Sequence, residues 1–158
     1  MKTFTYILVA ACALCLPGWG QDSPSLLPES YIALLRSNIQ SKKTTIVAEN
    51  LTLSDDQASK FWPLQRSFES DLAKLGDQRL EVIRDYAKSW DNLSDETATN
   101  LWRRLEDYHK KRLELRAKYF DRISKGVSPV IAAKYFQIET QLEDILDLEI
   151  ASEVPLIK

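Results

Sequence analysis

The chain has 158 residues, with 21 Lys or Arg against 23 Asp or Glu, so its formal net charge at pH 7 is −2. This balance gives no support for general nucleic-acid binding, and the length suits a single domain. The only histidine is His109, and the two cysteines lie near the N-terminus at Cys12 and Cys15. If those cysteines leave with a signal segment, a structural zinc site of the usual His/Cys type is excluded.

Residues 1–20 resemble an export signal. A charged start precedes an apolar run over residues 4–16, and Pro17-Gly-Trp-Gly20 ends it with small residues before a cut. Cleavage after Gly20 would deliver a periplasmic chain that has no cysteine and therefore no disulfide. The alternative is the lipobox-like stretch Val9-Ala10-Ala11-Cys12, which would leave a lipid-modified Cys12 as a membrane anchor.

The mature chain begins with residues 21–28, which the sequence predicts to be a short flexible arm. Apolar residues at helical spacing then predict a first helix over 29–50, with Pro28 suited to its start. From Ser54 an apolar seam with alternating steps of three and four predicts a second helix of about 35 residues. Together with two later helices, these segments predict one α-helical domain over 29–152, followed by a tail over 153–158.

A repeated helix start organises the chain. The first copy runs Leu53-Ser54-Asp-Asp-Gln57 into Phe61-Trp62-Pro63, and the second runs Leu93-Ser94-Asp-Glu-Thr97 into Leu101-Trp102. In both copies the serine suits an N-cap, and Gln57 completes a capping box in the first. A fainter third start places Ser128 before Pro129, which suits the first position of a last helix.

The third and fourth predicted helices carry charges that need partners. Arg112 and Arg122 occupy seam positions of the third helix where an apolar residue is expected, so they must pair or reach the surface. Gly126 is predicted to end that helix in the left-handed conformation. On the last helix, three acidic residues four apart form a row that requires a basic neighbour: Glu139, Glu143 and Asp147.

No segment shows the alternation of apolar and polar residues that is typical of a half-buried strand. The predicted fold is therefore all-α: an elongated hairpin of the two long helices, with the first and last helices packed along or across it. On the third predicted helix, acidic residues lie four positions before basic ones, and this pattern favours a solvated outer face.

The sequence offers little for catalysis, and no catalytic, cofactor-binding or metal-binding residue is predicted. His109 lies on a charged helix without a supporting motif and is interpreted as a surface or half-buried side chain. The acidic pairs Asp55-Asp56 and Asp95-Glu96 fall in first helical turns, where the helix dipole accounts for them. The equivalent residues Trp62 and Trp102 are either anchors where helices cross or a ligand-facing aromatic surface.

The third helix also holds the densest basic cluster. Three roles are open to it: a solvated helix face, pairing with the acidic row within the chain or in a dimer, or a docking surface for an acidic partner. Its members, the candidate partner-binding residues, are Arg103, Arg104, Lys110, Lys111, Arg112 and Arg116.

The exported, all-helical chain with a repeated Leu-Ser start resembles the Spy/CpxP superfamily of periplasmic proteins, which carries a twice-occurring LTxxQ motif. Here Ser54 replaces the threonine and the second copy has Thr97 in place of the glutamine; Phe61-Trp62-Pro63 is similar to an exported subgroup of unknown role. The resemblance implies an elongated helical cradle, usually an antiparallel dimer, that binds unfolded proteins without ATP, restrains a sensor kinase or senses metals. The chain departs from the family in having no methionine after Met1, a negative net charge and a single histidine.

The sequence therefore predicts a non-enzymatic periplasmic protein that binds a protein partner, as an ATP-independent chaperone-like protein or envelope-stress adaptor, and forms a homodimer. The alternatives are a regulatory partner of a periplasmic sensor domain and a structural helical oligomer. The recognition surface is expected on the flanks of the long hairpin rather than in the repeated motif.

Overall fold

The computed structural model describes residues 29–156, with side chains for residues 37, 39 and 41–156. The predicted signal segment 1–20, the possible anchor Cys12, and the arm 21–28 lie outside the described residues. Within them, four α-helices follow one another: α1 (Glu29–Asn50), α2 (Asp55–Ser89), α3 (Asp95–Gly126) and α4 (Pro129–Glu153), with a short 3₁₀ turn, η1 (Trp90–Asn92), between α2 and α3. The all-α prediction is confirmed.

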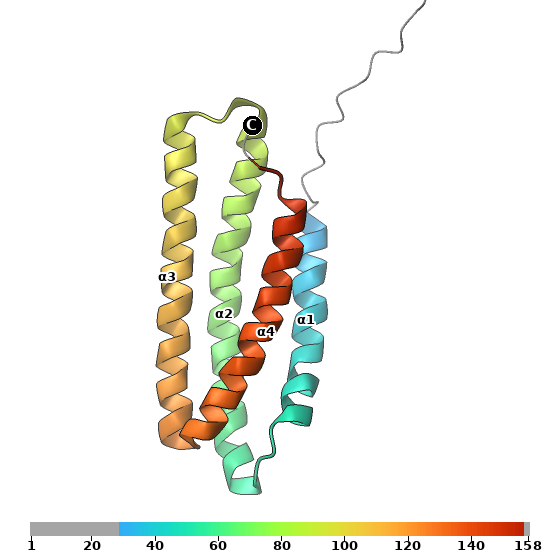
Figure 1. The fold of residues 1–158 in the computed structure, drawn as a ribbon, viewed down its shortest axis with the longest axis vertical. Helices are drawn as coiled ribbons and strands as arrows, with labels where there is room; N and C mark the ends of the chain where they lie inside the picture. The colour runs from blue at the N-terminus through green and yellow to red at the C-terminus, as the bar shows by residue number, and fades with distance from the viewer. Residues whose placement is uncertain (1–28, 157–158) are drawn as a thin grey trace, which may run out of the picture.

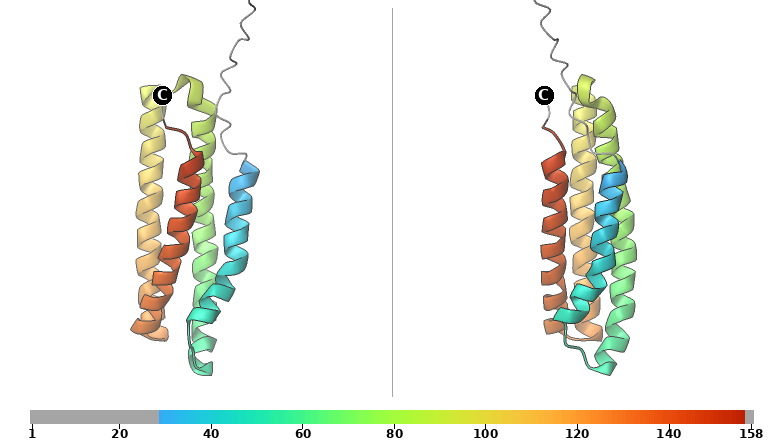
Figure 2. Two further views of the ribbon diagram at one scale, coloured as in Figure 1. Left: turned by 45° about the vertical axis from the view of Figure 1, so that its right-hand side comes forward. Right: turned by 90° about the vertical axis from the view of Figure 1, so that its right-hand side faces the viewer.

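The helices run alternately up and down and form a four-helix bundle (Figure 1). α2 and α3 make the long hairpin, with 35 and 32 residues. α3 packs against α4, and α4 packs against α1, which also contacts α2. Figure 2 shows α1 and α4 side by side along one side of this hairpin. The first and last helices therefore lie along the hairpin and close the bundle.

The predicted caps are present at three helix starts. Ser54 and Gln57 form the full capping box: the Gln57 N–H donates to the serine hydroxyl (3.3 Å), and the Ser54 N–H donates to the glutamine side chain (3.0 Å). At α3 the Thr97 N–H donates to the Ser94 hydroxyl at 3.2 Å. At α4 Ser128 is the N-cap and Pro129 is the first helical residue. These local hydrogen bonds satisfy N–H groups that a helix start leaves unpaired.

An aromatic core fills the end of the bundle where α1 turns into α2 and α3 turns into α4. Phe68 contacts Tyr119 and Phe136 edge to face, with ring centroids 5.4 and 5.3 Å apart, and Phe61 contacts Tyr135 in the same way at 5.3 Å. Edge-to-face pairs add to the large apolar area that such rings bury. The core is completed by Val47, Leu51, Ile123, Ile131 and Ala132.

The end of α3 differs from the prediction. No glycine among the described residues has a positive φ, so Gly126 does not end α3 in the left-handed conformation; it is the last α-helical residue. The N–H groups of Val127 and Ser128 both bond to the Ile123 carbonyl, which closes the helix without a left-handed residue.

Gly126→Ala is therefore expected to raise the free energy of unfolding by about 0.5–1 kcal/mol, because alanine loses less backbone freedom on folding. A Cβ at this position would lie 3.7 Å from the Cδ1 atom of Leu64, an ordinary contact. Urea unfolding of both proteins measures the difference. A loss of stability would instead show that the left-handed conformation is required.

Candidate functional site

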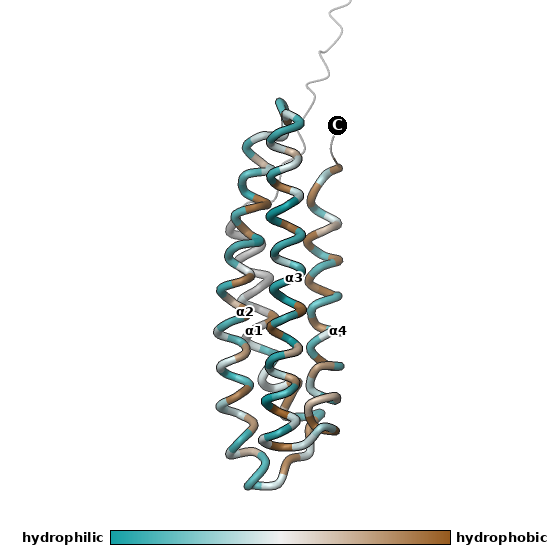
Figure 3. Tube along the Cα trace, turned by 90° about the vertical axis from the view of Figure 1, so that its left-hand side faces the viewer, coloured by the Kyte–Doolittle hydropathy of each residue, from teal (hydrophilic) through white to brown (hydrophobic). Residues whose placement is uncertain are grey.

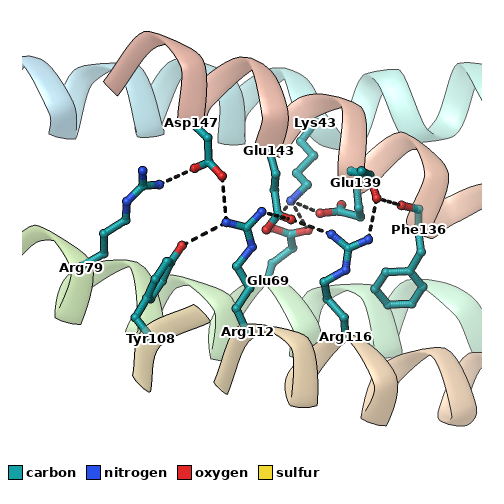
Figure 4. Close-up of polar contacts among 11 residues, drawn as sticks. Lys43, Glu69, Arg79, Tyr108, Arg112, Arg116, Phe136, Glu139, Glu143 and Asp147 are labelled. Atoms are coloured by element: carbon teal, nitrogen blue, oxygen red, sulfur yellow. Dashed lines mark hydrogen bonds and ion pairs between the residues drawn. The ribbon is translucent and has the colours of Figure 1, made fainter. Parts of the chain in front are cut away.

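A layer of charged side chains crosses the middle of the bundle, beyond the aromatic core. Each of the four helices contributes to it, and the side chains point toward one another between the helices (Figure 4). Four are basic and four are acidic, so the charged layer is balanced when all are ionised. Its members are Lys43, Glu69, Arg79, Arg112, Arg116, Glu139, Glu143 and Asp147.

At one end of the charged layer, Lys43 of α1 lies between two carboxylates. Its Nζ atom is 2.5 Å from Glu139 of α4 and 2.9 Å from Glu69 of α2. Glu139 is completely buried, and the Tyr135 hydroxyl donates to Glu69 at 3.1 Å. This lysine therefore joins α1 to both α2 and α4 through buried contacts.

The environment changes the proton affinity of these groups. Burial raises the pKa of Glu139 to about 7, even though Lys43 opposes the change. Burial alone would lower the pKa of Lys43, but the charges of Glu139 and Glu69 outweigh it and raise that pKa. Burial, with the two carboxylates, also raises the pKa of Tyr135, so its hydroxyl stays protonated and can donate.

At the other end of the charged layer, the arginines of α2 and α3 meet the acidic residues of α4. Arg112 bonds to Glu143 (2.9 Å) and Asp147 (3.0 Å), Arg116 bonds to Glu143 (2.8 Å), and Arg79 pairs with Asp147. The acidic row of α4 thus pairs within the chain, one of the roles open from sequence. Burial favours neutral Asp147, but Arg79 and Arg112 outweigh it and hold the pKa of that carboxyl below its usual value.

The charged layer holds the helices in register. Every carboxylate in it has a basic partner, and each helix contributes at least one charge, so a shift of one helix would separate buried charges from their partners. A cavity of about 80 Å³ lies beside it, lined by charged side chains and by Leu72, Leu142 and Leu146.

The six candidate partner-binding residues do not form one surface. Arg112 and Arg116 are turned into the charged layer. Arg104 pairs with Asp85 of α2 at 2.8 Å, and Lys111 pairs with Asp107 on its own helix at 2.6 Å. Arg103 and Lys110 are exposed, as is His109. Figure 3 shows that hydrophilic residues predominate along α3.

An apolar groove lies at the other end of the bundle, beside η1. It has a volume of about 420 Å³ and is formed by α2, α3, the end of α4 and the residues that follow it. Arg79 is its one charged lining residue among those described. The side chains that form its floor and walls include Val82, Ile83, Leu101, Leu105, Ile150 and Val154. The groove could not be predicted from the sequence because its walls come from three separate segments.

The two equivalent tryptophans have different environments. Trp62 packs against the aromatic core and contacts Phe61 edge to face at 5.1 Å. Trp102, also on the groove wall, is 63% exposed. The anchor interpretation therefore holds for Trp62, whereas Trp102 presents an aromatic surface to solvent.

The described residues add two further observations. Among residues 29–156, no group of three or more His, Cys, Asp or Glu side chains is arranged to hold a metal ion. In the same part of the chain, no helix combines the length and apolar character needed to cross a bilayer.

Comparisons with known protein families, curated proteins and solved structures find no match for this chain.

Proposed function

We propose that this chain is a non-enzymatic, exported protein that binds unfolded segments of other proteins without ATP, as the resemblance to the Spy/CpxP superfamily implies. The apolar groove is its binding surface. The observation that carries the proposal is the exposed Trp102 on the wall of a groove that, apart from Arg79, is lined mainly by apolar side chains. The signal-like residues 1–20 support a periplasmic location.

The energetics of the groove suit reversible binding. Exposed aromatic surface beside a groove is typical of a binding site rather than of a solvated helix face. Covering the exposed part of a tryptophan removes roughly 100–150 Å² of apolar surface from water, which contributes about 3 kcal/mol. That gain supports weak contacts with many sequences, which release without an energy source.

The test compares the mature chain, residues 21–158, with its Trp102→Ser variant. Each protein is added to a chemically unfolded client on dilution, and aggregation is followed by light scattering. The mature chain is expected to slow aggregation, and Trp102→Ser is expected to lose most of that effect because the groove loses its largest exposed ring.

Leu113→Ser is the matched control, because Leu113 is also on α3, is 68% exposed and does not line the groove. This variant should slow aggregation as well as the unchanged chain does. Equal loss in both variants would point to general surface hydrophobicity, and full activity of Trp102→Ser would remove the groove from the proposal.

A regulatory role at a periplasmic sensor domain is the second candidate, favoured by the exposure of Arg103 and Lys110. An acidic patch on a sensor would bind these side chains without disturbing the charged layer. The Arg103→Glu/Lys110→Glu variant should then lose sensor binding and keep its helicity, whereas Trp102→Ser should keep both. Unchanged binding by the charge-reversed variant would count against this role.

A further inference from the structure

The chain after α4 lies along the apolar groove. α4 ends at Glu153, and Val154 follows in an extended conformation with φ −87° and ψ 111°. The chain then turns away from the axis of α4, as Figure 1 shows. Three residues of the tail, Val154, Pro155 and Leu156, all line the groove.

A side-chain hydrogen bond from the bundle contacts the tail there. The Tyr86 hydroxyl of α2 donates to the carbonyl oxygen of Pro155 at 2.8 Å. Burial raises the pKa of Tyr86, so the hydroxyl keeps its proton. The Tyr86 ring is itself positioned by an edge-to-face contact with Trp90, with centroids 5.5 Å apart. The donor is therefore fixed by the bundle and does not depend on the tail.

We infer that the tail is an intramolecular ligand of the groove, and that the groove binds extended apolar peptide segments by the same contacts. A backbone carbonyl is present in every peptide, so the Tyr86 hydroxyl can hold any extended segment regardless of sequence. Pro155 needs no partner for an N–H group, and it favours an extended conformation in the residue before it. The apolar walls then accept the side chains. This inference rests on the proposed function and adds the class of ligand.

The tail is held weakly enough to be displaced. Leu156 is 89% exposed, and Val154 and Pro155 are no more than half-buried. A typical hydrogen bond contributes little net free energy, so most of the advantage of the tail comes from its attachment to α4. A client segment must compete with it, and removal of the tail should strengthen client binding roughly tenfold if the tail occupies the groove most of the time.

The test uses a fluorescent peptide with the sequence of residues 153–158, Glu-Val-Pro-Leu-Ile-Lys. The mature chain is compared with a chain that ends at Glu153, and binding is measured by fluorescence anisotropy. The shortened chain should bind the peptide roughly tenfold more tightly than the full chain. A control peptide with aspartate in place of the proline and leucine should bind neither chain.

Tyr86→Phe in the shortened chain keeps the ring and removes only the hydroxyl. It should weaken peptide binding about fivefold, since one hydrogen bond is lost. Tyr86→Phe in the full chain removes the same hydrogen bond from the tail and from the client, so the two losses should largely cancel and client binding should change by less than about twofold. Circular dichroism shows whether each variant retains its helices.

The outcomes separate this inference from the proposed function. If client binding depends on Trp102 but changes neither on truncation nor with Tyr86→Phe in the shortened chain, the inference is wrong and the function stands. If the peptide binds only the shortened chain while unfolded clients bind neither form, the tail contact is real and the chaperone-like function is wrong. Peptide binding of equal strength in the full and shortened chains overturns the inference.

Discussion

Replacing Arg112 by methionine is expected to lower the free energy of unfolding by about 3 kcal/mol. The side chain of Arg112 is only 12% exposed, and it bonds to two carboxylates of α4, Glu143 and Asp147. Its removal leaves the buried Glu143 and the half-buried Asp147 with one cation fewer. The cost lies at the low end for a broken buried pair because Arg116 and Arg79 still contact those carboxylates. Urea unfolding followed by circular dichroism measures the loss.

Two further variants show whether the loss comes from the unpaired charge. Lys110→Met removes an exposed charge from the same helix and should change the stability by less than about 0.5 kcal/mol. Arg112→Met combined with Glu143→Leu restores the balance of the charged layer and should recover part of the loss, since an apolar pair can replace a buried ion pair. The recovery is incomplete because Arg116 also loses its bond to Glu143. An Arg112→Met protein as stable as Lys110→Met would mean that the charged layer contributes nothing.

Stability is expected to fall as the pH rises from 5 to 8. Burial raises the pKa of Glu139 to about 7, so the folded protein holds a proton that the unfolded chain, with the usual value of 4.5, has released. The stabilisation from this proton is complete below pH 4.5 and is lost as the pH passes through 7. The expected loss is about 1–3 kcal/mol. Asp147 has a lowered pKa and acts in the opposite direction, but only at a pH below this window.

Glu139→Gln should remove this dependence, because glutamine remains neutral while Lys43 keeps its contact with Glu69. Unfolding is measured at a series of pH values for the unchanged chain and for the variant, and the variant should give a nearly constant free energy between pH 5 and 8. Glu149→Gln, on the exposed side of the same helix, is the control and should leave the slope unchanged. A flat or rising profile in the unchanged chain would contradict the prediction.

The bundle is divided along its length into three parts with different physical roles. Aromatic packing around Phe68 stabilises the end with the α1–α2 and α3–α4 turns. The charged layer fixes the register of the helices in the middle, where a purely apolar seam would tolerate sliding. The opposite end, beside η1, holds the apolar groove and lies away from the aromatic core.

The amino-acid sequence by itself determined the helices, their starts and the all-α class. Ser54, Ser94 and Ser128 act through bonds to backbone groups two or three residues away, and the apolar seams reflect the helical period. It also indicated that Arg112 and the acidic row of α4 need partners, because a charge on a buried face is costly whatever the topology.

Only the tertiary structure decided which groups meet. Lys43 has no distinguishing local pattern, yet it is the partner of Glu139 because α1 packs beside α4. Trp62 and Trp102 occupy the same place in a repeated motif, but one packs against the aromatic core and the other lies exposed by the groove. Gly126 remained helical because the backbone closes α3 at Ile123. Burial depends on contacts between distant segments, and local sequence does not encode these.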